Sequence, residues 1–278
     1  MRRKHRFAIT AAALALIAAA SSAAAQETAP PHDSLTIQSV ETREARRINV
    51  YLPPGYPEAR GTRYPVLYMP DGGIQEDFPH VAAAVDSAIR AGEMRPMLVV
   101  GIENTQRRRD MTGPTTVARD STIAPRVGGS AAFRAFIARE LMPEIGRRYR
   151  VTSETAIMGE SLAGLFVVET FFAQPDLFDT YIALSPSLWW NAEALVRASP
   201  ERLRTMPRVR AALFVASAGD DVPAEAGRLA DALREHAPAS VRWRYEPRPD
   251  LTHATIYRGM EKKVLRDWFP AHPAQPDL

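Results

Sequence analysis

Cysteine is missing altogether from this chain of 278 residues. Its absence excludes a disulfide framework and any metal site built on thiolates. The histidines offer no replacement, because the six of them are scattered, with no pair at the spacing of metal ligands. We therefore predict a protein without a metal or another cofactor, held together by packing alone.

Long hydrophobic runs are also scarce, and the conspicuous one lies at the start of the chain. Four basic residues within 1–6 precede an apolar run over 7–20, and small residues ending at Ala25 follow. This is the layout of a secretory signal peptide, and the run is shorter than the roughly 20 residues that span a bilayer. We expect cleavage after Ala25, a periplasmic or secreted protein, and no stable membrane insertion once the leader is removed.

The chain also lacks a strong excess of positive or negative charge. The chain has 35 Lys+Arg and 32 Asp+Glu, for a formal net charge of +3. Four of the basic residues and none of the acidic ones lie in the predicted leader, so 31 basic residues face 32 acidic ones in the remainder, a net charge of −1. A nearly neutral body gives no electrostatic reason to expect a nucleic-acid partner.

The remaining chain suits one α/β domain, because hydrophobic residues make up 46% of the sequence. We divide the chain into a signal peptide at 1–25, a flexible segment at 26–33, one domain at 34–270 and a tail at 271–278. No feature of the sequence specifies an oligomeric state.

Strand and helix patterns alternate along most of this domain. Segments that are β-branched or alternating, with Pro or Gly at their borders, predict eight strands, at 35–40, 48–52, 65–69, 97–102, 155–158, 181–184, 211–217 and 241–245. The later strands are separated by helical patterns, at 78–91, 131–149, 162–173, 224–236 and 255–269. This order predicts an antiparallel start and then a mostly parallel sheet with helices on both faces, the layout of the α/β-hydrolase fold.

The stretch AIMGESLAGLF, residues 156–166, joins a predicted strand to a predicted helix. Its G-x-S-x-A pattern is close to the G-x-S-x-G nucleophile elbow, where small residues flank the serine because strand and helix backbones pass closely. Gly159 meets this need, and Ala163 meets it less fully. Ser161 is therefore a candidate nucleophile. The alternative is a helix N-cap, since serine is favoured there as well.

A nucleophilic serine needs a base and an acid, and the expected chain order is serine, acid, histidine. Chain order and topology select His253, which follows the last predicted strand and precedes the last helix. The acid should follow the preceding strand, where Asp220 and Asp221 are adjacent and point in different directions. We expect one of them to reach His253 and the other to cap the next helix, with a slight preference for Asp221 as the acid.

An oxyanion needs preorganised donors. The first candidate is the backbone N–H of Leu162, directly after the serine. The second is the N–H of Gly73 in the stretch YMPDGGIQ, because the two glycines let the backbone approach a tetrahedral intermediate closely. A glycine-rich turn without a chemical role is the alternative interpretation of that stretch.

Several motifs together resemble a known family. They are YPVLYMPDGG, VVGIENTQRRRD, MGESLAGLF, LFDTYIALSPSLWWN and a late TH, and over residues 35–269 they look like the esterase D-like group of α/β-hydrolases. Within that group they are most similar to periplasmic esterases that open siderophore trilactones. The resemblance implies Ser161 as nucleophile, His253 as base, and Leu162 and Gly73 at the oxyanion positions. Some siderophore esterases resemble Ser-His dyads, so it leaves open whether an aspartate takes part.

The expected function is a secreted serine esterase that hydrolyses small-molecule carboxylic esters through an acyl-enzyme, with siderophore trilactones or aryl esters as substrates. A feruloyl or acetyl carbohydrate esterase is the alternative among enzymes, because the family includes both and a fold does not fix a substrate. A catalytically silent binding protein is the alternative of another class. Intact Ser161 and His253 argue against it.

Substrate contacts are expected from two places. The long connection at 103–130 carries Arg107 and Arg109, and arginine suits planar, oxygen-rich anions because it donates paired hydrogen bonds and stacks on aromatic faces. Arg109 could instead pair with a carboxylate such as Asp110 as a structural lock. Trp189 and Trp190 follow a strand end that faces the site, where either could line a pocket or belong to the core.

Overall fold

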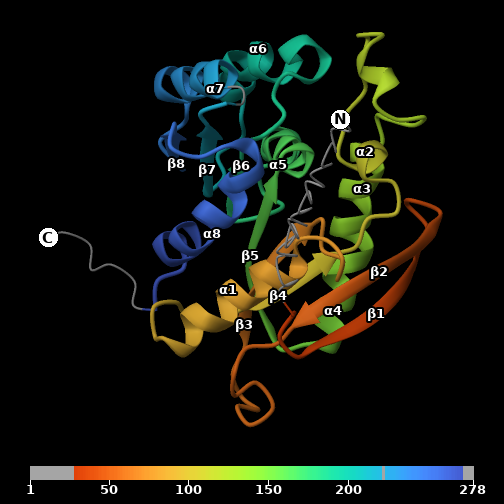
Figure 1. Ribbon diagram of the computed structural model, residues 1–278, viewed down its shortest axis with the longest axis vertical. Helices are drawn as coiled ribbons and strands as arrows, with labels where there is room; N and C mark the ends of the chain where they lie inside the picture. The colour runs from red at the N-terminus through yellow and green to blue at the C-terminus, as the bar shows by residue number, and fades with distance from the viewer. Residues whose placement is uncertain (1–27, 221–222, 272–278) are drawn as a thin grey trace, which may run out of the picture.

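A computed structural model describes residues 28–220 and 223–271, and Figure 1 shows their arrangement. Within these residues eight strands form one sheet in the order β1-β2-β4-β3-β5-β6-β7-β8. They are β1 (His32–Ser39), β2 (Glu44–Tyr51), β3 (Tyr64–Pro70), β4 (Leu98–Ile102), β5 (Val151–Glu160), β6 (Thr180–Leu184), β7 (Ala211–Ala218) and β8 (Val241–Arg248). The predicted leader, most of the predicted tail and Asp221 lie outside the described residues.

Only one strand of the described sheet, β2, runs against the other seven. β1 with β2 and β2 with β4 are antiparallel pairs, whereas every pairing from β4 through β3 to β8 is parallel. The short turn at 40–43 joins β1 to β2, and a turn of that length permits only antiparallel pairing, since a parallel pair needs a crossover of about a dozen residues or more. The predicted antiparallel start and mostly parallel sheet are both confirmed. β1 begins at His32, which pairs with Tyr51, inside the segment that the sequence predicts to be flexible.

Helices cover both faces of the sheet (Figure 1). One face carries α1 (Phe78–Arg90) and α8 (His253–Trp268), which pack against each other and against the sheet. The other face carries the remaining long helices and a helical stretch with a π turn in its middle. They are α3 (Ser130–Phe136), η2 (Ile137–Leu141), α4 (Met142–Arg148), α5 (Leu162–Ala173), α6 (Trp190–Arg204) and α7 (Pro223–His236). Two short elements, α2 (Arg107–Asp110) and η1 (Asp120–Thr122), lie in the long connection after β4.

The core follows from this layering. The strands β3, β4, β6 and β7 are buried along their whole length, as expected where helices cover both faces of a parallel sheet. The architecture is the α/β-hydrolase fold that the sequence predicts. In the described part of the chain, no helix combines the length and the apolar character needed to cross a bilayer. The carboxyl ends of the parallel strands meet at one edge, the usual place for a ligand in such folds.

Candidate active site

The chain turns sharply at Ser161, between the end of β5 and the start of α5. Ser161 has φ 59° and ψ −120°, a left-handed conformation that costs energy in any residue except glycine. A Cβ added to Gly159 would lie 2.7 Å from the Cβ of Ala163, so the strand and the helix pass too closely for a second side chain. The methyl group of Ala163 therefore fits because position 159 is glycine.

The Ser161 hydroxyl faces a histidine. Its Oγ lies 3.1 Å from Nε2 of His253 and makes no capping hydrogen bond to the described first turn of α5. The contact joins residues 92 positions apart in the sequence. This geometry favours the nucleophile over the N-cap as the interpretation of Ser161.

His253 is the first residue of α8, and Thr252 caps that helix with a reciprocal pair of hydrogen bonds to Thr255. The backbone N–H of His253 donates to Oδ1 of Asp220 at 2.8 Å. Through this contact, the side chain of Asp220 binds the backbone at the start of α8. The other predicted acid, Asp221, lies outside the described residues.

The two predicted oxyanion donors are placed differently. Leu162 lines the cavity that contains Ser161, and its amide is at the N-terminus of α5, where backbone N–H groups have no helical partner. The N–H of Gly73 instead donates to Oε2 of Glu76 at 2.7 Å. Gly73 also lines a cavity of about 330 Å³, with Arg47, Ile74, Gln75, Glu76 and Glu103.

Two adjoining cavities share Arg107 and Arg108. The smaller, of about 280 Å³, holds the site, and its remaining lining residues are Ile123, Ser161, Leu162, Ser187, Trp189 and His253. The larger, of about 460 Å³, is lined further by Gln106, Arg109, Ala124, Pro125 and Arg126. Four of its seven lining residues are arginines, which favours an anionic group there.

The arginines differ in what they already contact. Arg107 makes a two-point contact with Asp71, at 2.6 and 2.8 Å. Arg108 is exposed and donates to the backbone carbonyl of Ile123. Arg126 is exposed, and in the described part of the chain it has neither a hydrogen bond nor an ion pair. The charge most available to a ligand is therefore on Arg108 and Arg126, rather than on the predicted Arg107 and Arg109.

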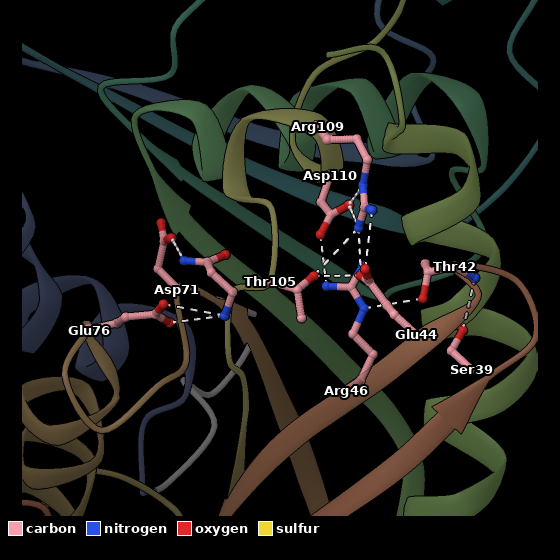
Figure 2. A network of polar contacts seen from close by, with 10 residues as sticks. Ser39, Thr42, Glu44, Arg46, Asp71, Glu76, Thr105, Arg109 and Asp110 are labelled. Atoms are coloured by element: carbon pink, nitrogen blue, oxygen red, sulfur yellow. Dashed lines mark hydrogen bonds and ion pairs between the residues drawn. The ribbon is translucent and has the colours of Figure 1, made fainter. Parts of the chain in front are cut away.

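Arg109 belongs to a buried ionic network (Figure 2). Its guanidinium contacts Glu44 at 2.6 Å and Asp110 at 2.7 Å. Arg46, whose side chain is fully buried, contacts the same two carboxylates at 2.7 Å each and lies against the rings of Phe133 and Phe136. This cluster, the Glu44–Arg46–Arg109–Asp110 network, ties the long connection to β2, as the lock interpretation of Arg109 requires.

The two tryptophans also differ in whether they are available to a ligand. Trp190 is 4% exposed and donates from Nε1 to the carbonyl of Gly113 at 3.0 Å, so it belongs to the core and anchors the long connection. Trp189 is partly buried and lines the smaller cavity.

A residue that the sequence did not single out completes the site. Oε1 of Glu160, at the end of β5, lies 3.1 Å from Nε2 of His253. Burial raises the pKa of Glu160 to about 7; His253 and Arg107 oppose the shift, and Asp77 and Asp71 add to it. The available signal was the acidic residue beside the serine, in a motif whose other positions are small or apolar.

Ser161 lies on such an elbow at the carboxyl edge of an α/β sheet, and its hydroxyl group contacts His253. These features define a site of the α/β-hydrolase class. The chain matches the Esterase family, described as "Putative esterase", over residues 39–264, and it belongs to that family.

Its relatives include siderophore esterases. The chain is 34% identical over 154 residues to the ferri-bacillibactin esterase BesA of Bacillus subtilis, covering 48% of this chain and 51% of that protein. It is 27% identical over 169 residues to the iron(III) salmochelin esterase of Escherichia coli O6:H1, covering 59% and 37%. The matches thus span about half or less of the length of these curated relatives. The crystal structure of an IroE-like serine hydrolase from Shewanella oneidensis has a TM-score of 0.79 at 25% identity, covering 86% of this chain and 80% of that one.

Proposed function

We propose that this protein is a secreted or periplasmic serine esterase that hydrolyses carboxylic esters through an acyl-enzyme. The observation that carries the proposal is the 3.1 Å contact between Ser161 Oγ and His253 Nε2 on the strained turn after β5. Membership of an esterase family supports it.

The reaction follows from the positions of three groups. His253 Nε2 takes the proton of Ser161 as Oγ attacks the ester carbonyl, and the backbone N–H of Leu162 is the donor available to the developing oxyanion. The N–H of Gly73 is not included, because it donates to Glu76. The imidazolium gives its proton to the leaving alcohol, and a water activated by His253 then releases the acid. Asp220 acts in this scheme by holding the backbone of His253.

The substrate that we propose is an aryl or anionic ester, with siderophore trilactones as the leading class. Trp189 offers an aromatic wall beside Ser161, and Arg107, Arg108 and Arg126 line the adjoining cavity. Charge complementarity there would bind the anionic part of the ester while its carbonyl reaches Ser161. A feruloyl or acetyl carbohydrate ester would use the aromatic wall but not the arginines.

The first experiment compares the mature protein with Ser161→Ala in the hydrolysis of p-nitrophenyl acetate and butyrate. We expect activity in the first protein and background rates in the second. Ser153→Ala, at an exposed serine on β5, the strand that precedes Ser161, is the control and should be unaffected. A fluorophosphonate probe that adds to the intact protein but not to Ser161→Ala would identify the nucleophile independently of the ester chosen. Equal background rates and no labelling would instead favour a silent binding protein.

The second experiment tests charge recognition. We expect Arg108→Gln with Arg126→Gln to reduce kcat/KM about tenfold for an anionic aryl ester and less than twofold for a neutral acetate. Arg119→Gln is the matched control, because this arginine lies in the same connection, has a side chain that is 81% exposed and lines neither cavity. Equal losses on both esters would overturn the proposed substrate class.

Secretion has its own test. Expression of the whole chain in a Gram-negative host should yield a periplasmic protein whose sequence begins at Gln26, and an intact Met1 terminus would contradict the predicted leader.

A further inference from the structure

One ring nitrogen in the site faces two oxygens. His253 Nε2 lies 3.1 Å from Ser161 Oγ and also 3.1 Å from Oε1 of Glu160. The Glu160 side chain is 15% exposed and that of His253 is 41% exposed. Glu160 is thus a mostly buried carboxyl group that contacts the atom expected to accept the serine proton.

The chemistry of imidazole limits what this arrangement can do. Each ring nitrogen carries either a proton or a lone pair. A carboxyl group at 3.1 Å from Nε2 forms a hydrogen bond only when a proton lies between the two atoms, because two lone pairs repel each other. While that proton is present, Nε2 is hydrogen-bonded to Glu160 and cannot take the proton of Ser161.

The charged groups around Glu160 come from several elements. Arg107 from α2 attracts its negative charge but is itself paired with Asp71, from the loop after β3. Asp77, directly before α1, repels that charge, and the buried hydroxyl group of Tyr257 on α8 contributes no charge. Because burial, together with Asp77 and Asp71, outweighs His253 and Arg107, the pKa of Glu160 is raised to about 7.

We propose that Glu160 is a positioning residue that shares one proton with His253 in the resting protein, withholds Nε2 from Ser161 until that proton leaves, and then stabilises the imidazolium formed during acyl transfer. The inference rests on the proposed esterase function. The acidic limb of the pH profile of kcat/KM then reports the loss of the proton that Glu160 and His253 share.

The proton balance is simple. Loss of one proton from the Glu160–His253 pair to solvent leaves a carboxylate and a neutral imidazole with a free lone pair at Nε2. Ser161 then gives its hydroxyl proton to Nε2 as the Oγ–carbon bond forms. The Nε2 proton passes to the leaving alcohol as the carbon–oxygen bond of the ester breaks. Glu160 neither gains nor loses a proton in that cycle, and its negative charge lies next to the imidazolium while it exists.

The test is the pH profile of kcat/KM for p-nitrophenyl acetate, a neutral ester, in the mature protein and in Glu160→Gln. The amide carries no charge, so we expect the acidic limb of the variant to move down by about one pH unit. Its alkaline plateau should fall about three- to tenfold, because the base loses its electrostatic support. The two profiles should therefore cross. Profiles that keep the same midpoint and differ only in height would overturn the inference.

Controls separate this effect from others. Glu103→Gln removes a carboxylate from the same edge of the sheet, at the end of β4, without removing a contact of His253, and its midpoint should not move. Glu160→Asp retracts the carboxylate by one methylene group and should give an intermediate profile if Glu160→Gln does not fold.

A second measurement does not depend on activity. The C2 proton of His253 in an NMR titration, assigned by its loss in His253→Asn, should show a lower midpoint in Glu160→Gln than in the parent protein. An unchanged midpoint would overturn the inference even in an active enzyme. A parent protein that hydrolyses no ester would instead contradict the proposed function, so the two failures are distinguishable.

Discussion

Two histidines of the described chain, His80 and His253, contact a mostly buried carboxyl group, and the two contacts do different things. His80 on α1 contacts Glu261 on α8 through Nδ1, at 2.5 Å, and Asp77 through Nε2, at 3.1 Å, and it is 3% exposed. His253 contacts Glu160 and Ser161 through one nitrogen and is much more accessible. In the first pair each ring nitrogen contacts a carboxylate, whereas in the second the nitrogen beside the carboxylate also faces a hydroxyl group.

The difference is electrostatic as well as geometric. Burial opposes a charge on His80, but hydrogen bonds to Asp77 and Glu261 prevail and raise its pKa to about 9. His80 is therefore an imidazolium at neutral pH and links α1 to α8, the helix that begins with His253. The structural pair thus fixes the helix that presents the proposed base, and its own protonation is stable over the range in which Glu160 titrates.

The largest expected effect comes from His253. We expect His253→Gln to reduce kcat about a thousandfold or more, because Ser161 loses its base. The same change at His80 should alter kcat per folded molecule less than threefold. Steady-state kinetics on samples matched for folded protein by circular dichroism would check this. A comparable loss of kcat in both variants would remove the distinction between the two pairs.

The next effect concerns stability, and His80 should dominate it. His80→Gln should lower the free energy of unfolding at pH 6 by about 2–3 kcal/mol, because a buried charge pair loses one partner. The folded-state pKa of about 9 exceeds the ordinary value of 6.5, so folding binds a proton more tightly. This contribution is fully present below pH 6.5 and is lost as the pH rises through 9. Urea unfolding of both proteins at pH 6 and pH 9.5 should therefore show a smaller difference at the higher pH.

Glu160 should affect stability in a lower pH window. Its folded-state pKa of about 7 is above the ordinary 4.5, so its contribution is present below pH 4.5 and is lost as the pH rises through 7. Relative to Glu160→Gln, the parent protein should lose about 2 kcal/mol of unfolding free energy between pH 4.5 and pH 8. Urea titrations at both pH values would measure the change. A difference that does not vary with pH would show that Glu160 titrates as it does in the unfolded chain.

The smallest effect is expected at the turn itself. Ser161→Gly relieves a left-handed backbone, so it should raise the free energy of unfolding by about 0.5–1 kcal/mol while abolishing activity. Ser153→Gly, in the exposed part of β5, should instead lower it by about as much, since glycine weakens a strand. Denaturant unfolding of the two variants side by side gives the sign directly.

The fold could be predicted from the sequence, because strands buried on both faces leave a continuous apolar signal between turn residues. The strand predicted at 155–158 is longer in the structure, where β5 runs from Val151 to Glu160. The prediction missed its first half because that half is polar and partly exposed. The helix α6 was not predicted. Pro200 lies inside it, and left-handed residues at 191–193 interrupt its first turn, so its sequence lacks an ordinary helical pattern.

The site could be predicted only in part. Local patterns indicated Ser161, and chain order selected His253, because topology determines which loops meet at the edge of the sheet. Side-chain partners are not encoded locally. Glu76 accepts a hydrogen bond from the N–H of Gly73, and Glu44 on β2 accepts one from the Arg109 guanidinium. The contact of Glu160 with His253 depends on how α8 packs, which no pattern near residue 160 specifies.

The long connection over the site is fastened unevenly. The Glu44–Arg46–Arg109–Asp110 network holds its start, and Asp120 accepts a hydrogen bond from the backbone of Asn191 further along. Residues 124–127 make no hydrogen bond within the described chain, although 124–126 line the arginine-rich cavity. Substitutions within residues 124–127 can therefore reshape the cavity without moving Ser161 or His253. The substrate range that we propose for this protein could thus be altered while Ser161 and His253 keep their positions.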